Sequence, residues 1–272
     1  MTMLGFGDEG ARRIQRVYST PDVERQRAEV LALLRPSPGE RILDVGSGPG
    51  FLAASIADAV GREGSVHGLD PSPAMNALAA AHCADRAWVV IDEGSAEALP
   101  YPDGDFDAAV STQVYEYVVD VLGALVEVRR VLRRGARFVV LDTDWDSVVW
   151  HAVDRALHER VLAAWQEHLV DPRLPRVLPG LLERAGFRVV DRVLIPLFNP
   201  VYDDDTYSAW TIDVIGDFVT GRQGLTEQDV DRWRQDLRSR GTDYLFSVNR
   251  FCFVAVATDG EPRETPPRAP IR

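Results

Sequence analysis

The chain has 272 residues, of which 46% are hydrophobic, and it carries a formal net charge of −12 with a pI near 4.9. This length supports one sizeable core, so we expect one domain with an elaboration rather than two domains. The acidic balance disfavours a nucleic acid as substrate, because phosphate binding depends on Lys and Arg.

The cysteine content and the sequence at the two ends of the chain argue against several further classes of protein. Cys83 and Cys252 are too few for a disulfide framework and match no zinc spacing. Residues 1–12 lack the apolar segment of a signal peptide, and no apolar run is long enough to span a membrane. We therefore expect a cytoplasmic protein with no membrane partner and no metal. Residues 259–272, rich in Pro, Glu and Arg, are expected to be disordered.

A first helix is predicted from Pro21 to near Pro36, because Thr20 can cap it and proline suits its first turn. A leading helix of this kind often covers a cofactor site, so we interpret residues 1–39 as a helical lid. Tyr18, just ahead of the helix, is a candidate contact for a cofactor or substrate. The alternative is a tyrosine that only packs at the surface.

A short strand and a glycine-rich turn follow. The apolar run at 42–45 predicts a buried strand, and the alanine-rich pattern at 51–60 predicts a helix. Three glycines stand between them at alternate positions: Gly46, Gly48 and Gly50. A ligand can touch the backbone of such a turn at the positive end of the helix. In the G-x-G-x-x-G pattern of dinucleotide enzymes, the third glycine would fall at Phe51.

Asp44, two residues before the first glycine, would repel a pyrophosphate and suits an ammonium group. The stretch from Asp44 to Gly50 resembles motif I of the class I S-adenosylmethionine (SAM) methyltransferases. The resemblance implies that SAM is the cofactor and that its binding residues here are Asp44, Gly46, Ser47, Gly48 and Gly50. The alternative is an ordinary strand, turn and helix with convenient glycines.

The next strand, predicted at 64–70, ends in the acid Asp70. In nucleotide-binding α/β folds, an acid at the tip of the second strand accepts hydrogen bonds from ribose hydroxyls. The alternative, that Asp70 only caps the next helix, is weakened by Ser72, which can serve as that cap. Pro71 flanks the place where an adenine would stack.

A third strand is predicted at 87–91, and residues 93–107 resemble the G-D-A-E-x-L-P segment of the same family. In the family, residues after the third strand meet the adenine. Here Ser95 stands where Asp is usual, so its hydrogen bond to an adenine amine would be weaker. The backbone N–H of Ala96 could serve the ring nitrogen.

The fourth predicted strand, 106–111, leads to two further candidates. Gln113 lies at the carboxyl end of the strand, and we expect it near the methionine part of the cofactor; the alternative is a helix cap. Tyr117 takes the place of a histidine that some small-molecule members of the family use as a base. This departure from the pattern puts a histidine base at that position in doubt.

After a fifth strand, three carboxylates stand at alternate positions: Asp142, Asp144 and Asp146. We expect them at a strand tip, where substrate chemistry would take place. A solvated loop is the alternative, and a calcium loop lacks its glycine and distal Glu here. A helix is predicted at 149–169, and His151 on it would lie nearest this tip. Our candidate bases are therefore His151, Asp144 and Tyr117, in that order.

Two long strands are predicted near the end of the chain, at 187–195 and 244–256. The segment 199–242 between them is too long for a hairpin loop and contains predicted helices at 207–219 and 228–237. We interpret it as a helical cap that shields the substrate from water. It could also be the surface of a homodimer.

The resemblance covers residues 40–142 closely and extends loosely to 257. It implies an α/β fold: a seven-stranded, mostly parallel, doubly wound sheet with strand order 3-2-1-4-5-7-6, an antiparallel last strand and a helical cap. The SAM-binding core would span 40–198, and residues 243–258 would supply its final strand.

The implied function is methyl transfer from SAM to an O, N or C nucleophile of a small molecule, as in the UbiE-like type, within secondary metabolism. Two alternatives remain open. One is a methyltransferase acting on protein or RNA. The other is a nicotinamide-dependent oxidoreductase, which Phe51 disfavours.

Overall fold

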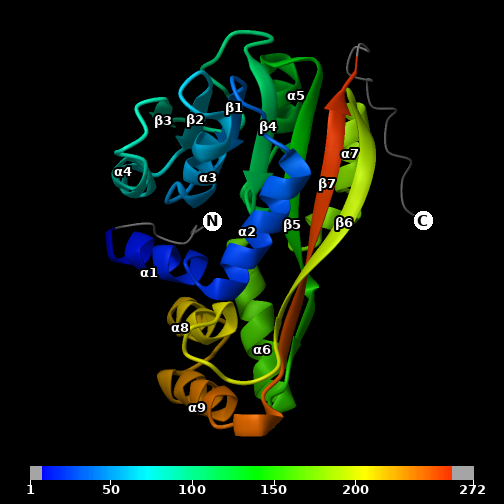
Figure 1. The fold of residues 1–272 in the computed structure, drawn as a ribbon. Helices are drawn as coiled ribbons and strands as arrows, with labels where there is room; N and C mark the ends of the chain where they lie inside the picture. Colours follow the sequence, from blue (N-terminus) through cyan, green and yellow to red (C-terminus); the bar gives the residue numbers. More distant parts are fainter. Residues whose placement is uncertain (1–7, 259–272) are drawn as a thin grey trace, which may run out of the picture.

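The computed structural model describes residues 8–258 (Figure 1). The tail predicted at 259–272 lies outside the described residues, as do residues 1–7. Seven strands form one sheet in the order β3-β2-β1-β4-β5-β7-β6. Strands β1 to β5 pair in parallel, whereas β7 is antiparallel to both β5 and β6. The predicted fold class and strand order are confirmed.

The strands are β1 (Arg41–Val45), β2 (Ser65–Asp70), β3 (Val89–Glu93), β4 (Phe106–Thr112), β5 (Leu132–Trp150), β6 (Phe187–Asn199) and β7 (Phe246–Ala257). The α-helices are α1 (Asp8–Tyr18), α2 (Pro21–Leu34), α3 (Phe51–Val60), α4 (Pro73–His82), α5 (Val121–Val131), α6 (Arg155–Trp165), α7 (Leu178–Arg184), α8 (Tyr207–Val219) and α9 (Glu227–Arg238). Single 3-10 turns are η1 (Tyr115–Tyr117), η2 (Gln166–His168), η3 (Leu174–Arg176) and η4 (Gly241–Asp243).

Helices cover both faces of the sheet, because side chains alternate between the two sides of each strand. On β1, Ile42 packs with apolar residues of α2 and α3, while Leu43 packs with those of α5 and α7. Both side chains are fully buried. The apolar residues on both sides of Asp44, which predicted this strand, therefore reflect burial on two faces.

Strands β5, β6 and β7 continue well beyond the ends of β1 to β4, and α6, α8 and α9 lie beside this extension (Figure 1). Pairing of β5 with β7 continues past Asp144, through a bulge, to Trp150. Two predictions fail here. The acids at 142–146 lie inside a strand rather than at its tip, and α6 begins only at Arg155, after the Asp154 cap, rather than at 149. Ladder pairing with β7 holds the β-branched Val149 in the strand.

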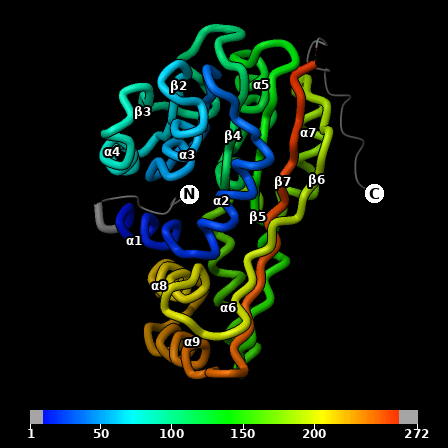
Figure 2. The backbone as a smooth tube through the Cα atoms, in the orientation of Figure 1, coloured from blue at the N-terminus to red at the C-terminus, as the bar shows by residue number. Residues whose placement is uncertain are grey.

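The N-terminal helices lie beside the helices inserted between β6 and β7, although some 190 residues separate them in the chain (Figure 2). Helix α1 contacts α8 on one side and α4 on the other. Val17 and Val23 share a hydrophobic cluster with Trp165, Ile212 and Trp233. Within residues 8–258, no helix combines the length and apolarity needed to cross a membrane.

Candidate active site

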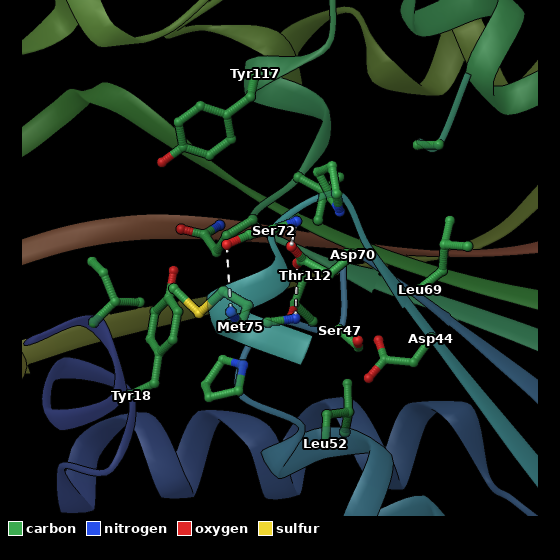
Figure 3. Close-up of a pocket in the computed structure, with 18 of the residues that line it drawn as sticks. Tyr18, Asp44, Ser47, Leu52, Leu69, Asp70, Ser72, Met75, Thr112 and Tyr117 are labelled. Atoms are coloured by element: carbon green, nitrogen blue, oxygen red, sulfur yellow. Dashed lines mark hydrogen bonds between the residues drawn. The ribbon is translucent and has the colours of Figure 1, made fainter. Parts of the chain in front are cut away.

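A cavity of about 730 Å³ lies at the carboxyl ends of β1, β2 and β4. This is the edge of an open α/β sheet where ligands bind. Residues of the glycine turn, of the ends of β2 and β4, and of η1 form its walls, and Ile14, Tyr18, Gln26 and Arg27 of the N-terminal helices close one side. Figure 3 places Tyr18 and Tyr117 toward one side of the view and Asp44 on the other, with Asp70 between them.

The glycine turn brings bare backbone to this cavity. Gly46, Gly48 and Gly50 all have positive φ, at 71°, 52° and 81°. A Cβ on Gly46 would collide with Val114, and one on Gly50 would lie 2.8 Å from the backbone of Ala79. A Cβ on Gly48 would meet nothing within 4 Å. The first and third glycines thus permit close packing, while the middle one leaves open space.

Two carboxyl groups flank the turn. Asp70 accepts hydrogen bonds from Gly48 N at 3.0 Å and from Ser72 N at 2.9 Å. Ser72 caps α4 by accepting from Met75 N, so Asp70 is not the sole cap of that helix. Burial raises the pKa of Asp70, while these two N–H groups lower it. Burial, and secondarily the charge of Asp70, raises the pKa of Asp44 to about 7.

Among the sequence-predicted cofactor residues that line the cavity, three have a polar atom buried without a hydrogen-bond partner in the described part of the chain: Asp44 Oδ2, Ser47 Oγ and Gln113 Nε2. Such atoms are costly unless a ligand or water satisfies them. They supply acceptors and a donor beside bare backbone. SAM, with its ammonium, carboxylate and ribose hydroxyls, matches these groups, and Leu69, Pro71 and Met75 add apolar surface for an adenine.

Of the sequence-predicted cofactor residues, the structure brings all eleven together around this one cavity: Tyr18, Asp44, Gly46, Ser47, Gly48, Gly50, Asp70, Pro71, Ser95, Ala96 and Gln113. Ten of them line it, and Gly50 completes the turn as the N-cap of α3. The Ser95 hydroxyl accepts a hydrogen bond from Glu97 N at 3.2 Å. Gln113 has φ of 59°, and its Oε1 accepts from Thr143 Oγ1 at 2.6 Å. Left-handed backbone in a residue other than glycine is typical of functional sites.

The three candidate bases lie in different places, and only one of them lines the cavity. Tyr117 lines the cavity, but burial raises its pKa well above the usual value, so its hydroxyl stays protonated. His151 is exposed, and its Nδ1 lies 2.7 Å from the carbonyl oxygen of Asp243. It does not line the cavity, because β5 carries it along the extension to the far end of the molecule.

Asp144 does not line the cavity either. Its two oxygens accept from Arg176 Nε at 2.7 Å and Nη2 at 2.9 Å. Asp146 joins the same guanidinium at 3.2 Å. These acids hold η3 against β5, which is a structural task. Within residues 8–258, no group of three His, Cys, Asp or Glu side chains is arranged to hold a metal ion.

A second chamber of about 40 Å³ adjoins the cavity. Ile14, Tyr18, Gln113, Tyr117 and Arg250 line both spaces. The inner chamber adds Glu116 and the rings of Trp145, Trp165 and Tyr207. Sequence reasoning missed Glu116 and Arg250. The sequence did carry a signal for them, since each is a charged residue within a mostly apolar or aromatic segment. Burying a charged side chain in such a segment is unfavourable, so its presence indicates a functional or structural role.

Comparisons with known proteins agree with this geometry. The methyltransferase domain family matches residues 43–140. An uncharacterized protein of a Streptomyces fradiae transposon is 35% identical over 256 residues, covering 88% of this chain and 69% of that protein. The ubiquinone/menaquinone biosynthesis C-methyltransferase UbiE of Methylobacterium nodulans is 39% identical over 166 residues, covering 60% of this chain and 62% of that enzyme.

A solved structure gives the same fold. The phosphoethanolamine N-methyltransferase 2 of Haemonchus contortus, in complex with SAM, superposes with a TM-score of 0.59 at 17% identity, covering 93% of this chain and 58% of that one. The chain thus spans less than two thirds of the length of the two named methyltransferases it matches. With the glycine turn, its flanking acids and the sheet order, these likenesses assign the chain to the class I SAM-dependent methyltransferases, with SAM as its cofactor.

Proposed function

We propose that this enzyme transfers the methyl group of SAM to an oxygen, nitrogen or carbon nucleophile of a small molecule of secondary metabolism. The observation that carries the proposal is the covered cavity. Helices α1 and α2 close it opposite the glycine turn, and about 730 Å³ falls within the range of small-molecule sites. We further propose that residues 1–39 act as the lid and 199–242 as the cap.

In this proposal, Asp70 accepts hydrogen bonds from the ribose hydroxyls and Asp44 faces the ammonium group of SAM. Ser95 and the backbone of Ala96 serve the adenine, with Leu69 and Pro71 against its faces. Gln113 Nε2 and the Tyr18 hydroxyl are donors for the methionine carboxylate. Each assignment follows from the type of group and its place on the cavity wall.

The sulfonium of SAM supplies an already activated methyl group. The protein must therefore hold the nucleophile in line with the methyl carbon and keep water out. The apolar and aromatic lining under α1 and α8 serves the second task. Tyr117 is held in its protonated form, so it can donate a hydrogen bond here. It cannot act as a base that removes a proton from the substrate.

Two measurements test the proposal. Calorimetry should detect binding of SAM but not of NADH. Labelled SAM, offered with a panel of phenols, amines and carboxylates and separately with RNA and a protein mixture, should label a small molecule, to be identified by mass spectrometry. Binding of NADH alone would support the oxidoreductase alternative, and label found only in RNA or protein would support the macromolecular one.

A further inference from the structure

A buried acidic side chain and a buried basic side chain both line the small inner chamber. Glu116 and Arg250 are each 1% exposed, and both line it. Among residues 10–258, whose side chains the structure describes, no ion pair joins Arg250 to Glu116 or to another carboxylate. The two groups therefore face the chamber without neutralising each other by direct contact.

Glu116 uses only part of its hydrogen-bonding capacity. Its Oε2 accepts from Trp145 Nε1 at 3.0 Å. Its Oε1 is buried and meets no donor of suitable geometry in the described chain, although the nearby Tyr117 hydroxyl lowers the pKa of Glu116. A buried carboxylate oxygen with spare capacity is a ready acceptor for a donor on a ligand.

Arg250 also uses only part of its hydrogen-bonding capacity. It donates through Nη1 to Gln26 Oε1, while its Nε has no partner within residues 8–258. Its guanidinium stacks 4.7 Å from the centre of the Tyr207 ring. Arginine keeps its positive charge in proteins, and burying that charge without an anionic partner is unfavourable. An oxygen that carries negative charge, in full or in part, would satisfy it.

Apart from these polar groups, aromatic rings form much of the wall of the chamber. Trp145 and Trp165 meet edge to face, with ring centres 5.8 Å apart. Tyr117 and Tyr207 supply two more rings. Aromatic walls favour an aromatic guest through stacked and edge-to-face contacts. The chamber itself has room for one small polar group, so the ring that bears this group would lie toward the larger cavity, beside Tyr18 and Tyr117, which line both spaces.

We propose that the inner chamber is the acceptor subsite for a hydroxyl on an aromatic ring, with Glu116 as the general base and Arg250 as the partner of the resulting oxyanion. This inference rests on the proposed function. It narrows the acceptor to phenol-type molecules and assigns a base to a site where Tyr117 cannot serve as one.

The step conserves atoms and charge. The phenolic O–H proton passes to Glu116 Oε1, and a lone pair of the oxygen forms the new O–CH₃ bond. The C–S bonding pair returns to sulfur, which leaves neutral S-adenosylhomocysteine. During the transfer the oxyanion lies against Arg250, so the number of charges inside the chamber does not rise.

The ionisation of Glu116 should govern the pH profile. The titratable groups around it are Asp142 from β5, Arg250 from β7, Tyr18 from α1, Tyr117 from η1, His168 from η2 and Tyr207 from α8. Burial raises the pKa of each tyrosine, and it lowers the pKa of His168 to about 4. Burial and the charge of Glu116 together raise the pKa of Asp142. Near neutral pH the tyrosines and His168 are therefore uncharged, whereas Arg250 keeps its positive charge.

Burial raises the pKa of Glu116 itself to about 7, against the lowering effects of Trp145 and Arg250. A base must be ionised to accept a proton. Turnover at saturating SAM should therefore rise with pH through about 7 and then level off. Saturation with SAM removes any contribution from its own binding site.

A binding experiment tests the subsite without turnover. The protein saturated with S-adenosylhomocysteine is titrated calorimetrically with 2-naphthol and with 2-methoxynaphthalene, which has the same ring but no O–H donor. We expect at least tenfold tighter binding of 2-naphthol. With SAM instead, mass spectrometry should detect 2-methoxynaphthalene as the product. Equal binding of the two probes would overturn the inference.

Variants separate the two roles. Glu116→Gln keeps the shape of the side chain and should abolish the rise in turnover near pH 7, while Arg250→Met should weaken 2-naphthol binding at least tenfold. Arg250→Lys serves where the Met variant fails to fold. Both changes should leave the SAM dissociation constant within twofold. Glu167→Gln, an exposed position on η2, is the matched control and should change neither quantity.

These experiments distinguish failure of the acceptor subsite from failure of the proposed function. If SAM does not bind, the proposed function itself fails. If SAM binds and other acceptors are methylated while Glu116→Gln keeps the wild-type pH profile, only the assignment of the base is wrong. If Arg250→Lys loses SAM affinity instead of naphthol affinity, Arg250 serves the cofactor and the subsite is refuted.

Discussion

The Asp70 carboxylate accepts a hydrogen bond from the backbone N–H of Gly48 at 3.0 Å and so ties the end of β2 to the middle of the glycine turn. The same carboxylate also accepts from Ser72 N. One side chain thus aligns two backbone segments on which the cofactor would rest. Its loss affects both the shape of the turn and the ligand bonds.

Asp70→Ala should weaken SAM binding by more than ~1 kcal/mol, because it removes charge-assisted hydrogen bonds to the ribose. Calorimetry with SAM measures this directly. Asp85→Ala, on the exposed surface beyond α4, is the control and should bind SAM like the wild type. Unchanged affinity of the Asp70 variant would refute the ribose assignment.

Gly46→Ala should destabilise the protein more than Gly48→Ala. Both positions have positive φ, so both substitutions carry the backbone strain of an L-residue there, ~1 kcal/mol. Only at position 46 does the new Cβ collide with Val114, and overpacking adds ~1–3 kcal/mol. Urea unfolding of the two ligand-free variants gives the difference. Equal losses would mean that the close approach of Val114 relaxes at little cost.

Asp44→Asn should stabilise the ligand-free protein at pH 8 and weaken SAM binding. The pKa of Asp44 in the folded protein, about 7, exceeds its ordinary value of 3.8, so the folded state holds a proton that the unfolded chain releases. The associated stability is present below about pH 4 and is lost as pH rises through about 7, with an upper limit of ~4 kcal/mol.

The test of this prediction is thermal unfolding of wild type and Asp44→Asn at pH 4 and pH 8. The midpoints should differ more at pH 8 than at pH 4. Since the ionised form faces the ammonium group, the affinity of the wild type for SAM should also rise between pH 6 and pH 8. A variant that shows the larger stabilisation at pH 4 would contradict the assignment.

His151→Ala should leave turnover and SAM affinity within about twofold of wild type. The side chain is exposed and its Nδ1 meets the Asp243 carbonyl oxygen, outside the cavity. Surface substitutions of this kind have small effects. Steady-state kinetics with any accepted phenol measures this, and a large loss of kcat would return His151 to the list of candidate bases.

Asp144→Asn should lower the midpoint of urea unfolding without changing SAM affinity, because it weakens the two-bond contact with Arg176 that holds η3 against β5. Arg176→Ala should have an equal or larger effect, because it leaves the buried Asp144 carboxylate without its positive partner, whereas the half-exposed Arg176 can be solvated when Asp144 is changed. A selective loss of turnover with unchanged stability would instead indicate a catalytic Asp144.

The sequence by itself determined the part of this protein that surrounds the proposed cofactor site. The strand at 41–45, the three glycines and Asp70 are local signals, since each depends on a few neighbouring residues and on the carboxyl edge that parallel strands share. The strand order and the cavity around Asp44, Gly46 and Asp70 therefore agree with what the local patterns predict.

The tertiary structure alone decided the acceptor half. How far β5 continues depends on its pairing with β7, about a hundred residues later, and this pairing moved Asp144 and His151 away from the cavity. Glu116 and Arg250 come together only because β7 returns beside β5 while η1 turns back over β5. No local pattern encodes such a meeting, because charge, burial and contact are set there by segments distant in sequence.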